Sequence, residues 1–255
     1  MNKNDISVQV YSARKFKPYE KILEFISSVG IKNVELFEID EFEKTKQFLE
    51  KYDLTSNSSH IPFSTLQNVK DIIKKLKLFN VKHAIIPCPE IIPGVEFKDN
   101  FNKSEEDWNN IGKLLSSYVS VFEDNGLTLG YHNHAFEFNK LPSGKMPIQC
   151  ILDHNESLKF EIDIGWTIAG NSDPIELIKQ YSDKIIACHL KDFYSKDVDF
   201  QDHDQQSSVG EGFIEWPVIL SEIKKTKCEI IAIEHDDPED YKDYITKSLN
   251  YLISI

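Results

Sequence analysis

Arginine is almost missing from this sequence, because Arg14 is the only one among 255 residues. Arginine forks commonly hold phosphates and carboxylates, and a cluster of them is absent here. The formal net charge is −13, and the basic runs are no longer than pairs such as Lys74 and Lys75. An acidic chain without a basic stripe repels phosphate backbones, so the composition predicts that nucleic acid is not a partner.

Long apolar runs are missing as well. No window approaches the ~18 consecutive apolar residues that a membrane-spanning helix needs. The N-terminal stretch MNKNDISVQV lacks the apolar region of a secretory signal. We therefore expect a cytoplasmic protein without a membrane partner.

Closely spaced cysteines are also lacking. None of the cysteines forms the C-x-x-C pattern of a zinc knuckle or a thioredoxin-like redox site. We expect them to behave as small buried hydrophobic side chains. They are Cys88, Cys150, Cys188 and Cys228.

The sequence does contain a repeated alternation of short β-branched runs with longer amphipathic stretches. The stretch 104–126 has the helical pattern, with Ser104 suited to cap its start and Gly126 its end. The run 54–62 is the weakest strand, because its SNSS segment has poor strand propensity. The eight runs are 5–12, 33–39, 54–62, 83–89, 127–134, 158–166, 185–192 and 229–236.

Eight strand–helix units without a Gly/Ser-rich linker predict an α/β fold, a (β/α)8 TIM barrel that forms a single domain over residues 1–255. The length agrees, since such barrels typically have ~250 residues. The alternative is a doubly wound open sheet. It is expected to carry a glycine-rich phosphate turn after its first strand, and YSARKF (11–16) contains no glycine.

Polar side chains gather where the predicted strands end. Active sites of such barrels lie at the carboxyl ends of the strands, and these residue types are costly to bury unpaired. We therefore expect one mouth of the barrel to carry the site. The candidates are Tyr11, Arg14, Glu35, Glu38, His60, His132, His134, Glu137, Glu161, Asp163, His189, Lys191, Asp192, Glu234, His235 and Asp236.

Three of these candidates lie at equivalent depths in their runs. With suitable register, Asp163, His189 and Glu234 all face the barrel interior. A divalent cation would offset the cost of burying them, and oxygen and imidazole ligands suit Mn²⁺, Mg²⁺, Co²⁺ or Zn²⁺. The pattern predicts one such ion with a fourth ligand from the run 127–134. The competing interpretation is an ion-pair network without metal.

At this point the sequence resembles the sugar phosphate isomerase/epimerase family of xylose-isomerase-like barrels, over essentially the whole chain. Each matching motif is modest alone, but together they occur in order at consistent barrel positions. They are VQVYSAR (8–14), GYHNHAFEF (130–138), FEIDIGW (160–166), CHLKD (188–192), VGEGFIEW (209–216) and IAIEHD (231–236).

The resemblance implies one divalent metal held by a Glu, an Asp, a His and a second Glu on strands five to eight. Three of these correspond to Asp163, His189 and Glu234. The strand-five ligand departs from the family pattern, because His132 stands at the depth where many relatives have Glu. We favour Glu137 as this ligand, since a second anionic Glu would complete the pattern. His132 or His134 is the alternative.

The same resemblance implies an isomerase or epimerase that transfers a proton through an enediolate of a keto sugar, a sugar phosphate or a related polyol. Whether the substrate is phosphorylated stays open. The expected catalytic groups are Glu137, Glu234 and His132. The expected substrate-binding groups are His60, His134, Lys191, Arg14 and Glu211, the last on a loop that closes over the substrate.

Other functions remain as alternatives. A dehydratase or lyase acting on an inositol-type or keto-sugar substrate would begin with the same proton abstraction. An endonuclease IV-like DNA repair enzyme and a non-catalytic sugar-binding barrel are more distant, because the first needs a basic surface and the second would be expected to lose the ligand set. Glu161 either hydrogen-bonds a metal ligand or pairs with Lys191. Assembly into a homo-oligomer is left open.

Overall fold

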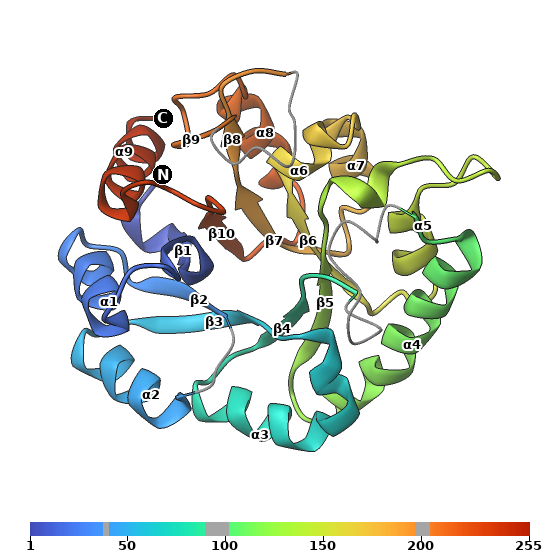
Figure 1. Ribbon diagram of the computed structural model, residues 1–255, viewed down its shortest axis with the longest axis horizontal. Coiled ribbons are helices and arrows are strands. Elements are labelled where there is room, and N and C mark those ends of the chain that lie inside the picture. Colours follow the sequence, from blue (N-terminus) through green and yellow to red (C-terminus); the bar gives the residue numbers. More distant parts are fainter. Residues whose placement is uncertain (38–40, 90–101, 197–204) are drawn as a thin grey trace.

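Eight parallel strands close on themselves in the computed structural model, which describes residues 1–37, 41–89, 102–196 and 205–255 (Figure 1). The strand order around the barrel is β1-β10-β7-β6-β5-β4-β3-β2. Closure excludes the open doubly wound sheet and confirms the predicted TIM barrel. The strands are β1 (Ile6–Gln9), β2 (Asn33–Phe37), β3 (Thr55–His60), β4 (His83–Ile86), β5 (Thr128–His132), β6 (Lys159–Asp163), β7 (Ile185–Leu190) and β10 (Ile230–Ile233).

Each strand lies within one of the eight predicted runs, including the weak one. Strand β3 forms despite its serines because β2 and β4 pair with it on both sides, with Ser59 opposite Leu36 and Ala84. Pairing with neighbouring strands therefore outweighs local propensity. The last two residues of the predicted run 33–39, which include Glu38, lie outside the described residues.

Helices surround the barrel and carry the expected caps. Ser104 accepts a hydrogen bond from the backbone of Asp107 at the start of α4, and Gly126 adopts a positive φ of 76° after its end. The helices are α1 (Tyr19–Ser28), α2 (Phe42–Lys51), α3 (Val69–Leu78), α4 (Glu105–Glu123), α5 (Pro147–Leu152), α6 (Ile164–Ala169), α7 (Pro174–Gln180), α8 (Trp216–Ile223) and α9 (Tyr241–Ser254).

Short elements of secondary structure lie at the end of the barrel where the strands terminate. A two-stranded ribbon of β8 (Asp192–Phe193) and β9 (Gln206–Ser207) follows β7, and the 3-10 turn η5 (Ala135–Phe138) follows β5.

Among the described residues, no helix combines the length and apolar character that crossing a membrane requires. Cys150 and Cys188 are buried as expected, whereas Cys88 and Cys228 are partly exposed.

The two faces of the sheet differ in polarity, and strand β6 illustrates this. Phe160 and Ile162 belong to the apolar core, while Glu161 lies near His189 of β7 and Asp163 lies near Lys191, which directly follows β7. Because side chains alternate along a strand, the same period that fills the core also lines the interior with charge. All four residues are fully buried.

Candidate functional site

Strands β6 and β7 place two candidate ligands side by side. The register pairs Asp163 with His189, and it pairs His189 with Ala232 on β10, two residues before Glu234. The three side chains therefore approach the barrel axis near the carboxyl ends of their strands. Asp163 and His189 lie on neighbouring parallel strands, and Glu234 directly follows the last residue of β10.

An upper group forms at this level from His132, Asp163, His189 and Glu234. One ligand atom from each residue lies within 4.8 Å of all the others. All four residues are buried. The structure thus brings Asp163, His189 and Glu234 together, and it adds His132 from β5.

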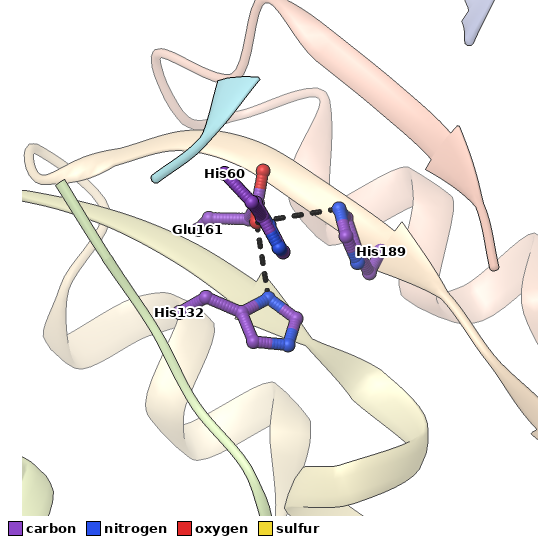
Figure 2. Close-up of side chains that lie close together, drawn as sticks. All are labelled: His60, His132, Glu161 and His189. Carbon is purple, nitrogen blue, oxygen red and sulfur yellow. Dashed lines mark hydrogen bonds and ion pairs between the residues drawn. The ribbon is translucent and has the colours of Figure 1, made fainter. Parts of the chain in front are cut away.

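A lower group lies beneath it and shares two of the same histidines. It consists of His60, His132, Glu161 and His189, and Figure 2 shows the Glu161 carboxylate between the imidazole rings. Glu161 Oε2 lies 2.6 Å from His60 Nε2, 3.0 Å from His132 Nδ1 and 3.3 Å from His189 Nε2. Glu161 therefore contacts candidate ligands directly and does not pair with Lys191.

A second buried carboxylate supports the lower group from β2. Glu35 Oε2 lies 2.5 Å from His189 Nε2 and accepts a hydrogen bond from Gln9 Nε2 at 2.8 Å. Burial and the neighbouring charge of Glu161 raise the pKa of Glu35. The histidine and both carboxylates are completely enclosed, so none of them can exchange these partners for bulk water.

The charge on His189 is set by the carboxylates around it. Burial alone favours the neutral ring, but Glu161 and Glu234 outweigh burial and raise the pKa of His189 well above its ordinary value. Burial likewise opposes ionisation of Glu234, yet Lys191 and His189 hold its pKa well below the usual range. His189 Nδ1 lies 2.9 Å from Glu234 Oε2. A proton on this nitrogen therefore lies where a cation bound by His189 Nδ1 would lie.

His132 and Asp163 respond to burial in opposite ways. Burial lowers the pKa of His132 to about 4, so its ring is neutral at neutral pH. Burial also raises the pKa of Asp163 well above its ordinary value, and Lys191 only partly opposes this effect. A neutral imidazole can ligate a cation without losing a proton, whereas an ionised Asp163 needs a positive partner.

Asp163 provides the test of whether a cation fits. Its Oδ1 accepts a hydrogen bond from the backbone of Trp166 at 2.7 Å, but its Oδ2 is buried without a hydrogen bond. Lys191 Nζ is the cation near Oδ2, at 3.9 Å. Buried carboxylate oxygens ordinarily have closer partners. The orphaned oxygen and the mixed imidazole and carboxylate donors fit a divalent cation in the upper group.

Glu137, the expected strand-five ligand, is not among the residues that converge in this group. Its Oε1 accepts a hydrogen bond from Tyr131 Oη at 2.6 Å, and its Oε2 accepts one from the backbone of His134 at 2.8 Å. Turn η5 folds Glu137 back as a capping box, on the side of the strand where Tyr131 joins the outer core. Burial raises the pKa of Glu137 to about 8. Its oxygens thus serve the local fold, and His132 takes the place in the upper group.

Two of the expected substrate-binding residues also have other surroundings. His60 is buried in the lower group, bonded to Glu161, and does not stand at the rim. Glu211 is exposed and lies 3.5 Å from Lys247 of α9, so the structure directs it outward along the helix layer. Neither placement leaves these side chains facing the upper group.

The remaining expected residues do surround the mouth. Lys191 is fully buried, donates to Asp236 Oδ1 at 2.7 Å and lies 3.3 Å from Glu234 Oε2. Arg14 is half-buried and donates to the backbone carbonyl of Asp236 while it covers the Tyr11 ring at 3.8 Å.

His134 is half-buried at the rim of the mouth. Its ring stacks on Phe136 at 5.5 Å and lies 5.8 Å from the ring of Trp166. The ammonium of Lys191 also approaches Trp166, at 4.8 Å from its ring. One indole therefore forms a wall between the rim histidine and the buried lysine.

Sequence reasoning named Glu35 and Glu161 among the polar residues but assigned no certain role to either. The available signal was parity: Glu161 stands two residues before Asp163, so both point to the same side of β6. Gln206, which bonds to the Asp236 carboxylate, was missed altogether because it lies in a polar stretch without a periodic pattern.

A family model described as a xylose isomerase-like TIM barrel matches residues 23–255. Among curated proteins, an inosose dehydratase from Clostridium botulinum is 25% identical over 96 residues, which is 38% of this chain and 32% of that protein. The chain thus matches about a third of the length of this relative.

Solved structures share the fold over nearly the whole chain. A sugar phosphate isomerase/epimerase from Parabacteroides distasonis has a TM-score of 0.80 and 18% identity, and the match covers 99% of this chain and 98% of that one. The IolI protein with a bound zinc atom has a TM-score of 0.74 and 14% identity, and the match covers 98% and 97%. At these identities the likeness shows the fold alone.

Proposed function

Because the matching family model spans most of the sequence, this chain belongs to the xylose isomerase-like TIM barrel family, and we propose that it is a divalent-metal-dependent isomerase or epimerase of a keto sugar, a sugar phosphate or a related polyol. The observation that carries this proposal is the convergence of four buried ligand atoms within 4.8 Å. The zinc atom in the IolI structure supports a metal in a barrel of this fold. The residues that would hold it are His132, Asp163, His189 and Glu234.

The bound cation would supply positive charge beside the two oxygens of an enediolate, which is the unstable species in such a reaction. The protein contributes the frame, because three of the side chains come from adjacent strands and Glu234 directly follows the next strand, β10. Such preorganisation stabilises developing charge without rearrangement of the site.

Proton transfer falls to side chains on opposite sides of the mouth. His134 is the candidate base on the β5 side, since its ring is neutral: burial lowers its pKa well below the ordinary value, which also makes it a weak base. Glu234 is the carboxylate on the β10 side, kept ionised by Lys191 and His189. Removal of the α-proton by one group and return to the neighbouring carbon gives an isomerase. Return to the opposite face of the same carbon gives an epimerase.

Substrate contacts would come from the wall of the mouth. Trp166 is almost fully buried and its Nε1 has no hydrogen bond, so the indole can donate to a sugar hydroxyl. The charge of Lys191 is already shared by Asp236 and Glu234, which leaves it poorly suited to hold a phosphate. These features favour hydroxyl recognition at the inner part of the site.

A dehydratase is the second candidate, and the local match to an inosose dehydratase favours it. The same α-proton abstraction would be followed by departure of a hydroxyl group from the next carbon. The two outcomes differ in product, because loss of water gives a conjugated enone that absorbs in the ultraviolet, whereas isomerisation and epimerisation conserve mass.

Deuterium incorporation from D₂O into keto sugars and inososes tests the proposal. The metal-loaded protein is expected to exchange the α-proton of a substrate, and Asp163→Asn is expected to exchange it at least ~10²-fold more slowly. Asp173→Asn is the matched control, since this exposed residue caps α7 and asparagine caps as well. Equal exchange by the Asp163→Asn protein would refute the assignment.

A further inference from the structure

We propose that Glu161 is a positioning residue that decides which nitrogen of His132 is left to bind a cation in the upper group. The inference rests on the proposed function, because His132 matters as a ligand only if a cation binds. Glu161 itself would not touch the cation. Its role would be to hold the His132 ring by Nδ1.

The contacts of one carboxylate oxygen carry the inference. Glu161 Oε2 lies 3.0 Å from His132 Nδ1. The same oxygen lies 3.3 Å from His189 Nε2, but Glu35 Oε2 is nearer to that nitrogen, at 2.5 Å. The ring that Glu161 holds is therefore that of His132, and its Nε2 is the nitrogen left for a cation.

An ionised carboxylate accepts hydrogen bonds and cannot donate them, so each nitrogen that faces Glu161 must carry the hydrogen. A neutral imidazole with a hydrogen on Nδ1 has its lone pair on Nε2. Glu161 thus selects the tautomer of His132 that leaves Nε2 able to bind a cation. Outer hydrogen bonds of this type commonly fix the tautomer and orientation of metal-binding histidines.

Burial of Glu161 and His132 strengthens the preference for one tautomer of His132. Glu161 and His189 are fully buried, and His132 is almost so. The rings of His60 and His189 stack at 5.4 Å with an interplanar angle of 11°. His60 Nε2 also bonds to Glu161 Oε2 at 2.6 Å, which holds the carboxylate in place. Bulk water does not reach the group to replace a lost contact.

Histidine tautomers can be read directly in the metal-free protein by nitrogen NMR with labelled histidine. His132→Gln identifies the signals of His132 by their loss. The wild-type protein is expected to carry the His132 hydrogen on Nδ1 with Nε2 unprotonated. Glu161→Gln places an amide donor beside the ring and is expected to shift the hydrogen toward Nε2. A wild-type ring with hydrogen on Nε2, or on both nitrogens, would overturn the proposal.

Metal affinity supplies the second readout. Loss of such a contact typically weakens metal binding by ~10–100-fold, and we expect this of Glu161→Gln with one ion still bound at saturation. Glu137→Gln is the matched control, because Glu137 is an equally buried glutamate outside both groups, and its affinity is expected to stay at the wild-type value.

The outcomes separate the two claims. Unchanged affinity in Glu161→Gln would overturn the positioning role. Two bound ions in the wild type and one in Glu161→Gln would overturn it too, since Glu161 would then be a ligand. A wild-type protein that binds no divalent ion would refute the proposed function, and the tautomer of His132 would still decide the role of Glu161.

Discussion

Replacement of Glu137 by Gln separates its structural role from a catalytic one. Burial raises the pKa of Glu137 to about 8 in the folded protein. In the unfolded chain its pKa returns to an ordinary value near 4.5. Between these values the folded state keeps a proton that the unfolded state has lost, so this group makes the protein less stable as the pH rises.

The size of the effect follows from the proton difference. One proton held by the folded state alone costs about 1.4 kcal/mol of unfolding free energy per pH unit. Between about pH 5 and pH 7.5 the contribution sums to about 3 kcal/mol. Gln does not titrate and resembles the protonated acid: its oxygen can accept from the His134 backbone and its amide can donate to Tyr131 Oη.

Urea unfolding of the wild type and Glu137→Gln at both pH values measures this contribution. The variant is expected to gain about 3 kcal/mol relative to the wild type as the pH rises over this range. Taking the difference between the two proteins cancels the titration of distant groups. Parallel stability profiles would show that Glu137 is not a buried, protonated acid.

The same variant is expected to bind metal and exchange substrate protons within about threefold of the wild type, because no described contact joins Glu137 to the upper group. A general base or metal ligand would instead lose ~10²–10⁴-fold in rate. Such a loss in the metal-loaded variant would refute the placement of Glu137 outside the site.

The upper group, the loop residue Glu211 and the acidic surface give further predictions. Asp163→Asn and Glu234→Gln should each lose most bound metal in elemental analysis, and full occupancy in both would contradict the ligand assignment. Glu211→Ala should change the unfolding free energy by no more than about 1 kcal/mol and leave KM unchanged, since its partner is the exposed Lys247; a raised KM would restore a substrate contact. A DNA or RNA duplex should not bind at physiological salt because the net charge is −13; sub-micromolar affinity with a steep salt dependence would disprove this.

The barrel could be predicted because its signal is repeated and local. In β6, Phe160 and Ile162 alternate with Glu161 and Asp163, so one segment reveals the strand, its core face and its polar face. The polar residues at the strand ends then indicated the end of the barrel where the upper group forms. The relative depth of Asp163 and His189 followed from counting, and the register pairs the two residues directly.

The placement of Glu137 could not be reached by counting, because it depends on a turn. The family pattern favoured a second glutamate at the metal, but His134 and Glu137 have the three-residue spacing of a capping box, and the chain uses it. That spacing was the available signal. Turn η5 then directs the carboxylate toward Tyr131 rather than toward the barrel axis.

The lower group was hidden for a different reason. His60 and Glu161 are 101 positions apart, and their contact exists only because β3 and β6 belong to the same closed barrel. A single sequence contains no record of which interior residues meet across the axis. Periodicity showed that these residues point inward, while their pairing required the three-dimensional structure.

Anomalous diffraction from crystals grown with Mn²⁺ or Zn²⁺ would locate the bound cation. We expect one peak in the upper group, with His132, Asp163, His189 and Glu234 as its protein ligands at about 2.0–2.2 Å. Glu137 should remain bonded to Tyr131. A peak coordinated by Glu137, a peak confined to the lower group, or no peak at saturating metal would refute the metal site in the upper group.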